Sequence, residues 1–262
     1  MGGMNIGLLH PGEMGSAVGR CLTGHGHTVL WAPAGRGDLT AARAAAAGLT
    51  DAGTVAGVAD RADVIFSICP PHAALDVARQ VAGFTGLFVE ANAISPATAR
   101  EAAASIEAGG GTFVDGGIVG PPPTAPGQTR LYLSGTGAAR VSELFDGTAV
   151  DARIVAGGVG AASAVKMSYA AWTKGTAALL LAIRDMARAE GVEDVLLEEW
   201  ALSQPALPAR SEQAARSAAA KGWRWIAEME QIAATMTADG LPGGFHLAAA
   251  SIYRRWPRPP GV

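Results

Sequence analysis

A glycine-containing turn near the start of the chain limits the fold most strongly. In IGLLHPGEMGSAVG (6–19), an apolar run leads into Gly12 and Gly15, which have the last spacing of the dinucleotide-binding pattern G-x-G-x-x-G. His10 replaces the first glycine, and histidine is among the residues better tolerated at unusual backbone angles. An apolar run at 27–31 completes the strand–helix–strand context that the pattern requires. The alternative is a glycine-rich turn that binds another ligand.

The two remaining glycines keep defined roles in such a turn. The second glycine lets the backbone approach the pyrophosphate, and the third lets the helix pack close to the strand. The start of the helix offers N–H groups and a partial positive charge to the phosphates. The expected cofactor contacts are therefore His10, Pro11, Gly12, Glu13 and Met14.

Strand and helix patterns alternate as far as residue 155. Strands are predicted at 5–9, 27–31, 63–68, 87–90, 112–115, 130–134 and 152–155, and helices between the first six begin near Glu13, Asp38, Val55, His72 and Pro96. This alternation predicts a doubly wound parallel sheet of the Rossmann type. The Gly- and Pro-rich segment 116–128 is predicted to be a loop.

The pattern changes to helix alone after the breaker AGGVG at 156–160. One long helix is predicted at 161–189, followed by helices at 192–203, 206–220, 223–238 and 244–255, with breaks marked by Pro205, Pro208, Gly240 and Pro242. The predicted fold class is α/β, with a dinucleotide-binding domain at 1–157 and an all-α domain at 158–262 that holds substrate and forms a dimer.

Composition excludes several classes of function. A net charge of -3 gives no basic footprint for nucleic acid. The longest apolar run, AALLLAI (177–183), is far shorter than the roughly 20 residues of a membrane span. No histidine cluster has metal-ligand spacing, and Cys21 and Cys69 are expected to be reduced thiols. The N-terminus lacks the pattern of a signal peptide, so a cytoplasmic protein with a small-molecule substrate is expected.

The end of the second strand favours NADP over NAD. An NAD site usually has an acid there that holds the ribose hydroxyls, but this strand ends at Trp31 and no acid follows. Arg36, in the next loop, could grip a 2′-phosphate with two hydrogen bonds. Cys69, Pro70 and Asn92 end later strands at the sheet edge where ligands bind, and are further expected contacts.

Four segments resemble the β-hydroxyacid dehydrogenase superfamily, which includes 3-hydroxyisobutyrate dehydrogenases, 6-phosphogluconate dehydrogenases and imine reductases. They are HPGEMG (10–15), FVEANAISPATAR (88–100), FVDGGIVG (113–120) and GGVGAASAVKM (157–167). Two more, KMSYAAWTKGTAALL (166–180) and LPGGFHLAAASIYRRW (241–256), resemble a narrower branch whose C-terminal domain has no known function.

The resemblance implies a Rossmann domain, a long helix between domains, and a helical domain that forms a homodimer. It also implies that substrate lies between the domains, over the nicotinamide. Lys166 is in register with the family's catalytic lysine, which acts as general acid or base. Partial burial can lower the pKa of a lysine toward neutrality, which suits that role.

Several positions depart from the family pattern. Ala170 replaces an asparagine, Asn92-Ala93 replaces a Ser-Thr pair, and Val119 and Gly120 lie where the substrate-loop serine is expected. Phe245-His246 replaces a late Lys-Asp pair, and His246 is a candidate substrate contact. Because groups that bind carboxylates are fewer, a less polar ketone or imine is favoured over an ordinary hydroxyacid.

Helical spacing puts Lys166, Tyr169, Thr173 and Lys174 on one face, so these side chains could act together on a substrate. Tyr169 is a candidate catalytic residue beside Lys166 and Asn92; Thr173 and Lys174 are candidate substrate contacts. The sequence therefore predicts an NADP-dependent oxidoreductase. An oxidative 3-hydroxyacid dehydrogenase of the phosphogluconate type and a non-catalytic NADPH-binding module are the alternatives.

Overall fold

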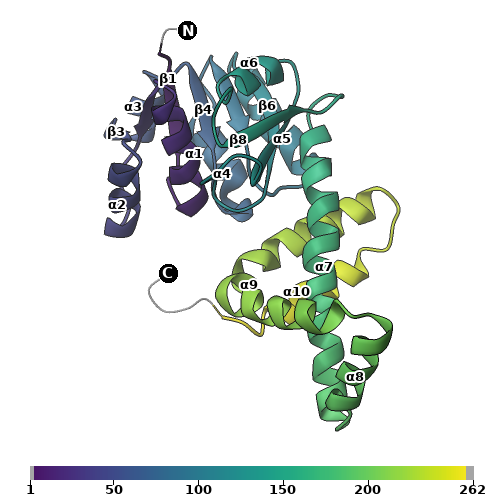
Figure 1. The fold of residues 1–262 in the computed structure, drawn as a ribbon. Helices are drawn as coiled ribbons and strands as arrows, with labels where there is room; N and C mark the ends of the chain where they lie inside the picture. The colour runs from purple at the N-terminus through teal and green to yellow at the C-terminus, as the bar shows by residue number, and fades with distance from the viewer. Residues whose placement is uncertain (1–2, 258–262) are drawn as a thin grey trace. The chain divides into compact units, whose positions relative to one another are not determined.

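The computed structural model describes residues 3–257, and the chain divides into two compact units, Met1–Lys166 and Met167–Val262 (Figure 1). The first unit holds a sheet with helices on both faces. The second unit is built from helices. Each unit is described separately below.

The first unit is built on an eight-stranded sheet in the order β3-β2-β1-β4-β5-β6-β7-β8. The strands are β1 (Asn5–Leu9), β2 (Thr28–Trp31), β3 (Thr50–Asp51), β4 (Val64–Ser67), β5 (Leu87–Glu90), β6 (Thr112–Val119), β7 (Thr129–Ser134) and β8 (Val150–Ile154). All neighbours are parallel except β6 and β7, which are antiparallel. The predicted Rossmann-type architecture is confirmed, with this one reversed pair.

Two hydrophobic clusters cover the two faces of the sheet. The helices of this unit are α1 (Glu13–Gly24), α2 (Asp38–Ala46), α3 (Val55–Ala59), α4 (Ala74–Gln80), α5 (Pro96–Ala108) and α6 (Ala138–Glu143), with a 3₁₀ turn η1 (Pro71–Ala73) before α4. One cluster packs α1 and α6 on one set of strand side chains, and the other packs α3, α4 and α5 on the alternate set. Successive strand residues point to opposite faces, so strands buried on both sides read as continuous apolar runs.

The helical unit continues from α7 (Ala161–Ala189), a helix that begins in the first unit. It then contains α8 (Glu193–Ser203), α9 (Leu207–Ala238) and α10 (Gly244–Tyr253). The Tyr253 hydroxyl donates a 2.6 Å hydrogen bond to the Lys174 carbonyl, and its ring meets Trp225 edge-on at 5.1 Å. The C-terminal end of α10 is thereby joined to both α7 and α9.

Two local predictions were wrong, and two short elements were not predicted. Residues 116–119 extend β6 and are not loop, because they pair with β7. The helices predicted at 206–220 and 223–238 are one helix, since Gly222 is buried against Tyr253 and Trp256 and no break is needed there. The two-residue β3 and the six-residue α6 were not predicted, because segments so short carry little periodicity.

Candidate functional site

The glycine-containing turn joins β1 to α1 with a strained residue. His10 has φ 68°, and it is the one non-glycine residue with a positive φ in the described part of the chain. A Cβ added to Gly15 would stand 2.7 Å from the His10 carbonyl oxygen, so this position needs glycine. A Cβ added to Gly12 would meet nothing within 4 Å, so the turn presents bare backbone to open space. That surface and the start of α1 at Glu13 suit the phosphates of a dinucleotide. Pro11 is buried and Met14 is half-buried beside the turn.

The side chain of Arg36 lies against the same turn. Its Nη2 is 3.1 Å from His10 Nε2, and no carboxylate among residues 3–257 forms an ion pair with it. Burial, together with the guanidinium, lowers the pKa of His10 to about 4, so the ring is neutral near pH 7. The end of β2 brings buried Trp31 and Ala32, not an acid, to this edge. A half-buried arginine without a carboxylate partner can bind an anion.

Asn92 joins the ends of β4 and β5. Its Nδ2 donates to Ser67 Oγ at 3.0 Å and to Cys69 Sγ at 3.2 Å, and its Oδ1 accepts from the Cys69 amide. Burial raises the pKa of the Cys69 thiol to about 12, so it stays protonated and donates to the Pro70 carbonyl. Cys69 and Asn92 are therefore brought together, beside exposed Pro70, but the polar atoms of Asn92 are engaged within the protein.

Two buried carboxyl groups beneath this edge were not singled out from the sequence. Glu90 and Asp115 end the predicted strands at 87–90 and 112–115 and lie side by side on β5 and β6. Glu90 Oε1 accepts from the Asn92 amide at 3.0 Å, and burial raises the pKa of Glu90 to about 8. The sequence did carry a signal for these two residues, because each is a carboxylate at the end of an apolar strand pattern.

Asp115 holds the start of α7. Its Oδ2 accepts from the amides of Gly160 and Ser163 at 2.9 Å each and from Ser134 Oγ at 3.1 Å, and its Oδ1 accepts from Ser163 Oγ. A carboxylate at a helix N-terminus is favourable because it satisfies amides that lack helical partners and complements the helix dipole. The Asp115 side chain therefore ties the start of the long helix to β6.

Lys166 lies on α7 directly over β6. A Cβ added to Gly117 would stand 2.8 Å from the Lys166 Cβ and 3.1 Å from the Ala162 carbonyl, so glycine at 117 lets the helix approach the strand. Lys166 is half-buried. The same strand carries Val119, which is buried and paired with Arg130, and not on a loop as predicted.

Gly120, predicted beside the substrate, makes the turn after β6. It has φ 122°, and an added Cβ would stand 2.2 Å from the Gln128 carbonyl oxygen. Its backbone conformation therefore accounts for the glycine without a ligand.

The remaining candidates belong to the helical unit. Tyr169 is 46% exposed, and the Thr173 hydroxyl donates to its carbonyl at 3.0 Å. Lys174 forms an ion pair with buried Glu228, so its ammonium is turned into the helical core. His246 is also buried, with Nε2 3.3 Å from the Ala171 carbonyl.

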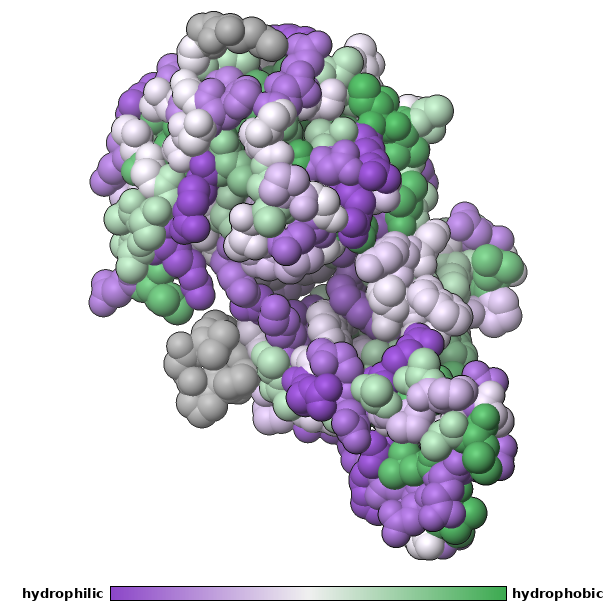
Figure 2. Space-filling view, viewed as in Figure 1, coloured by the Kyte–Doolittle hydropathy of each residue, from purple (hydrophilic) through white to green (hydrophobic). Residues whose placement is uncertain are grey.

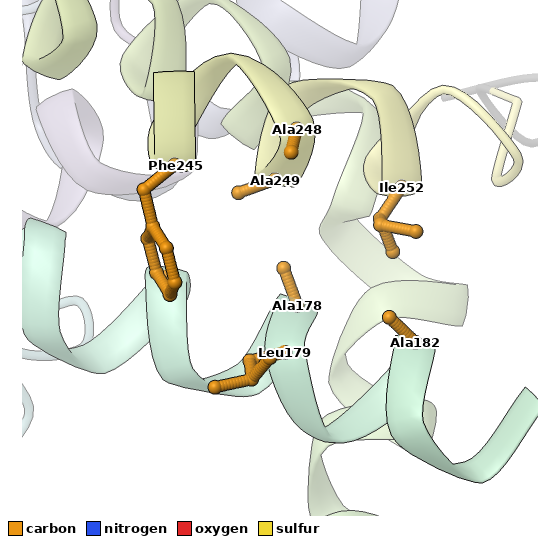
Figure 3. A pocket seen from close by; sticks show the side chains of 8 residues that line it. Ala178, Leu179, Ala182, Phe245, Ala248, Ala249 and Ile252 are labelled. Atoms are coloured by element: carbon orange, nitrogen blue, oxygen red, sulfur yellow. The ribbon is translucent and has the colours of Figure 1, made fainter. Parts of the chain in front are cut away.

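An apolar pocket lies between α7 and α10 (Figure 3). Ala178, Leu179 and Ala182 face Ala248, Ala249 and Ile252 across it, and Phe245 closes one end. The residues that line this pocket are apolar, so the pocket offers hydrophobic contact.

From 3 to 257, no three His, Cys, Asp or Glu side chains gather to hold a metal ion. Within that range no helix combines the length and apolar character needed to cross a membrane.

Residues 5–169 match the family model described as the NAD binding domain of 6-phosphogluconate dehydrogenase. Residues 187–256 match a domain of unknown function, DUF1932. An uncharacterized 28.5 kDa protein of Methanothermus fervidus, encoded in a 7S RNA 5′ region, is 31% identical over 137 residues. That match covers 52% of each chain, so this chain spans about half the length of its curated relative.

Two solved structures show the same fold over nearly the whole chain. One is the conserved protein MTH1747, of unknown function, which is described as structurally similar to 3-hydroxyacid dehydrogenases. Its TM-score is 0.74 at 26% identity, and the alignment covers 97% of this chain and 96% of MTH1747. The reductive aminase of Aspergillus terreus, in complex with NADPH and ethyl levulinate, has TM-score 0.62 and 20% identity, with coverages of 97% and 93%. The solved structures share the fold of this chain, and the family match identifies residues 5–169 as a dinucleotide-binding domain. The chain belongs to the family of the NAD binding domain of 6-phosphogluconate dehydrogenase, joined here to a C-terminal domain of unknown function.

Proposed function

We propose that the protein is an NADP-dependent oxidoreductase that transfers hydride to or from a small carbonyl, imine or hydroxyl carbon, with Lys166 as general acid or base. One observation carries the proposal: Arg36, which has no carboxylate partner among residues 3–257, lies against the glycine-containing turn at the edge where this fold binds its dinucleotide.

The choice of NADP depends on charge. A carboxylate at the end of β2 would favour the free ribose hydroxyls of NAD and repel a 2′-phosphate, but Trp31 and Ala32 occupy that end. The guanidinium of Arg36 can bind a phosphate through two parallel hydrogen bonds. The reductive aminase with the same fold is described with NADPH, which agrees with this choice.

A bound reduced nicotinamide would supply a hydride to the substrate carbon. The chain's own contribution is a proton, because reduction of a carbonyl or imine adds one hydride to carbon and one proton to oxygen or nitrogen. Lys166 Nζ is the proposed donor, and in the reverse direction the proposed acceptor. Tyr169 and Thr173, three and seven residues further along the helix, are proposed substrate contacts on the same face.

Asn92 is proposed to act through its neighbours. Because its amide holds Ser67 and Cys69 together, it fixes the backbone at the carboxyl ends of β4 and β5. Cys69 and Pro70 are the proposed cofactor contacts there. The proposed substrate has little carboxylate character, since Ala170 and Val119 are buried apolar residues where the family has polar ones.

The experiment that tests the proposal combines binding and turnover. Purified protein is titrated with NADPH and NADH by calorimetry, then assayed against panels of ketones, imines and 3-hydroxyacids. We expect NADPH to bind at least about tenfold more tightly, a difference of about 1.4 kcal/mol. Lys166→Ala should lower kcat and keep the cofactor Kd, whereas Lys221→Ala, at an exposed lysine of α9, should change neither.

Each alternative gives a different result. Binding of neither cofactor would refute the nucleotide site. Binding of NADPH with no effect of Lys166→Ala on any turnover would favour a non-catalytic NADPH-binding module. Turnover confined to 3-hydroxyacids with loss of CO₂ would favour the phosphogluconate-type alternative.

We further propose that the helical unit forms a homodimer through α7 and α10. Trp172 and Met186 on α7 are 64% and 63% exposed, and Phe245 and Leu247 on α10 are 52% and 53% exposed. Phe245 also lines the apolar pocket of Figure 3. Hydrophobic side chains reach the surface near α8 as well (Figure 2). Exposed apolar patches of this kind mark association surfaces.

The dimer is tested by sedimentation of the whole chain. Phe245→Glu should produce monomers at a concentration where the parent protein is dimeric. Leu39→Glu, at a similarly exposed leucine on α2, should leave the dimer intact. A monomeric parent protein would overturn the proposal.

A further inference from the structure

We propose that His10 is a positioning residue for cofactor selection: its ring holds the Arg36 guanidinium against the turn, where that guanidinium selects a 2′-phosphorylated ribose. This inference rests on the proposed NADP site. It assigns to His10 a role that acts through Arg36 and not through the pyrophosphate.

The backbone at His10 shows that its side chain is not needed for the turn. With φ 68°, this position lies in the left-handed region, which glycine adopts freely and other residues adopt at a cost. Glycine would make the same turn without strain. The imidazole must therefore contribute something else, and the contact it makes is with Arg36 Nη2 at 3.1 Å.

The contact with His10 matters because the loop that carries Arg36 does little to restrain the arginine side chain. Gly35 has φ 73°, and Gly37 is the N-cap of α2, so the arginine stands between two glycines. Its amide donates to the Pro33 carbonyl at 2.9 Å, which fixes the backbone but not the long side chain. The contact with His10 joins residues 26 apart in sequence and ties this loop to the end of β1.

The contact leaves the positive charge available. A neutral imidazole accepts one N–H of the guanidinium through Nε2, with its own proton on Nδ1, and most of the arginine donors stay open for a phosphate. Burial and the guanidinium both lower the pKa of His10, which keeps the ring neutral. Cys69 also interacts electrostatically with Arg36, and because its thiol is protonated it adds no negative charge there.

The test is a double-variant cycle on the full chain, with Kd for NADPH and NADH measured by calorimetry at pH 7.5. His10→Gly keeps the turn and removes the ring; Arg36→Ala removes the guanidinium. We expect His10→Gly to weaken NADPH about tenfold and to change NADH by less than about twofold. In the Arg36→Ala background, His10→Gly should have no further effect on NADPH. The control, His25→Gly at the other end of α1, is expected to change neither Kd.

Equal weakening of both cofactors by His10→Gly would mean that the ring merely stiffens the turn. The inference would also be overturned if His10→Gly weakened NADPH binding by the same factor with and without Arg36→Ala. A second measurement separates it from the proposed function. Nitrogen-15 spectra of the histidine rings should show His10 protonated on Nδ1 and accepting at Nε2, and Arg36→Ala should raise the pKa of His10.

If the spectra agree but the parent protein binds neither cofactor, the proposed function and this inference both fail. If the parent protein prefers NADPH but His10→Gly keeps that preference, this inference alone fails.

Discussion

Gly117 faces Lys166 so closely that a methyl group on its α carbon would stand 2.8 Å from the Lys166 Cβ. The position of the proposed acid/base is therefore set by a residue of β6 that has no side chain.

Gly117→Ala is expected to displace Lys166 and to lower kcat by about a hundredfold, because small misplacements of reacting groups are costly. The cofactor Kd should stay within about twofold, since the glycine-containing turn is untouched. Steady-state kinetics and calorimetry on the same preparation measure both. Gly24→Ala, where an added Cβ meets nothing within 4 Å, is the control. An unchanged kcat would show that the helix shifts without consequence.

Asp115→Asn should destabilise the first unit strongly. The amide nitrogen cannot accept hydrogen bonds, so donors among Ser134, Gly160 and Ser163 would lose their partner in the protein interior. A loss of about 2–4 kcal/mol in the free energy of unfolding is expected from urea denaturation. Asp146→Asn, at an exposed aspartate, should stay within about 0.5 kcal/mol of the parent protein. Equal midpoints for the two variants would contradict this account of Asp115.

Glu90 predicts how stability changes with pH. Burial raises the pKa of Glu90 to about 8, so the folded protein holds this proton more tightly than the unfolded chain does. Protonated Glu90 therefore contributes to the free energy of unfolding. This contribution is fully present below the ordinary pKa of glutamate and is lost as pH rises through about 8. Glu90→Gln stays neutral at every pH. Urea midpoints between pH 6 and 9 should therefore fall more steeply for the parent protein, and parallel curves would refute the prediction.

The ion pair between Lys174 and Glu228 should contribute to the stability of the helical unit. Their side chains are 20% and 5% exposed, so removal of one charge takes a close opposite charge away from a group that is shielded from water. Lys174→Met should cost about 3–5 kcal/mol, whereas Lys174→Met with Glu228→Leu should recover most of it. Urea denaturation of both variants measures this. If the double variant is no more stable than the single one, the pair is not the source of the loss.

Long periodic elements could be predicted from the sequence. The strand at 5–9 and the helix at 161–189 have the predicted bounds, because each carries a clear apolar pattern. Position 222 shows the limit: a glycine at a predicted boundary lies inside α9, because neighbouring aromatic rings cover it. Residues 116–119 likewise become strand through pairing with β7, which local composition cannot show.

Part of the candidate site could be predicted in the same way. The unusual backbone at His10 follows from the displaced glycine, and the absence of an acid after β2 follows from the sequence. The contact between His10 and Arg36 could not be predicted, since it joins a turn to a separate loop. The arrangement of Glu90 beside Asp115 depends on strand register, and that of Lys174 beside Glu228 on helix packing.

The left-handed residue before α1 also bears on protein engineering. Selection for heat resistance favours substitutions that remove backbone strain, and His10→Gly is such a change. If His10 supports Arg36 as proposed, heat-resistant variants that carry His10→Gly would discriminate less between NADPH and NADH. Thermal tolerance and cofactor choice would then trade off at one position, so an engineering programme that seeks both should keep histidine at residue 10 and vary other positions.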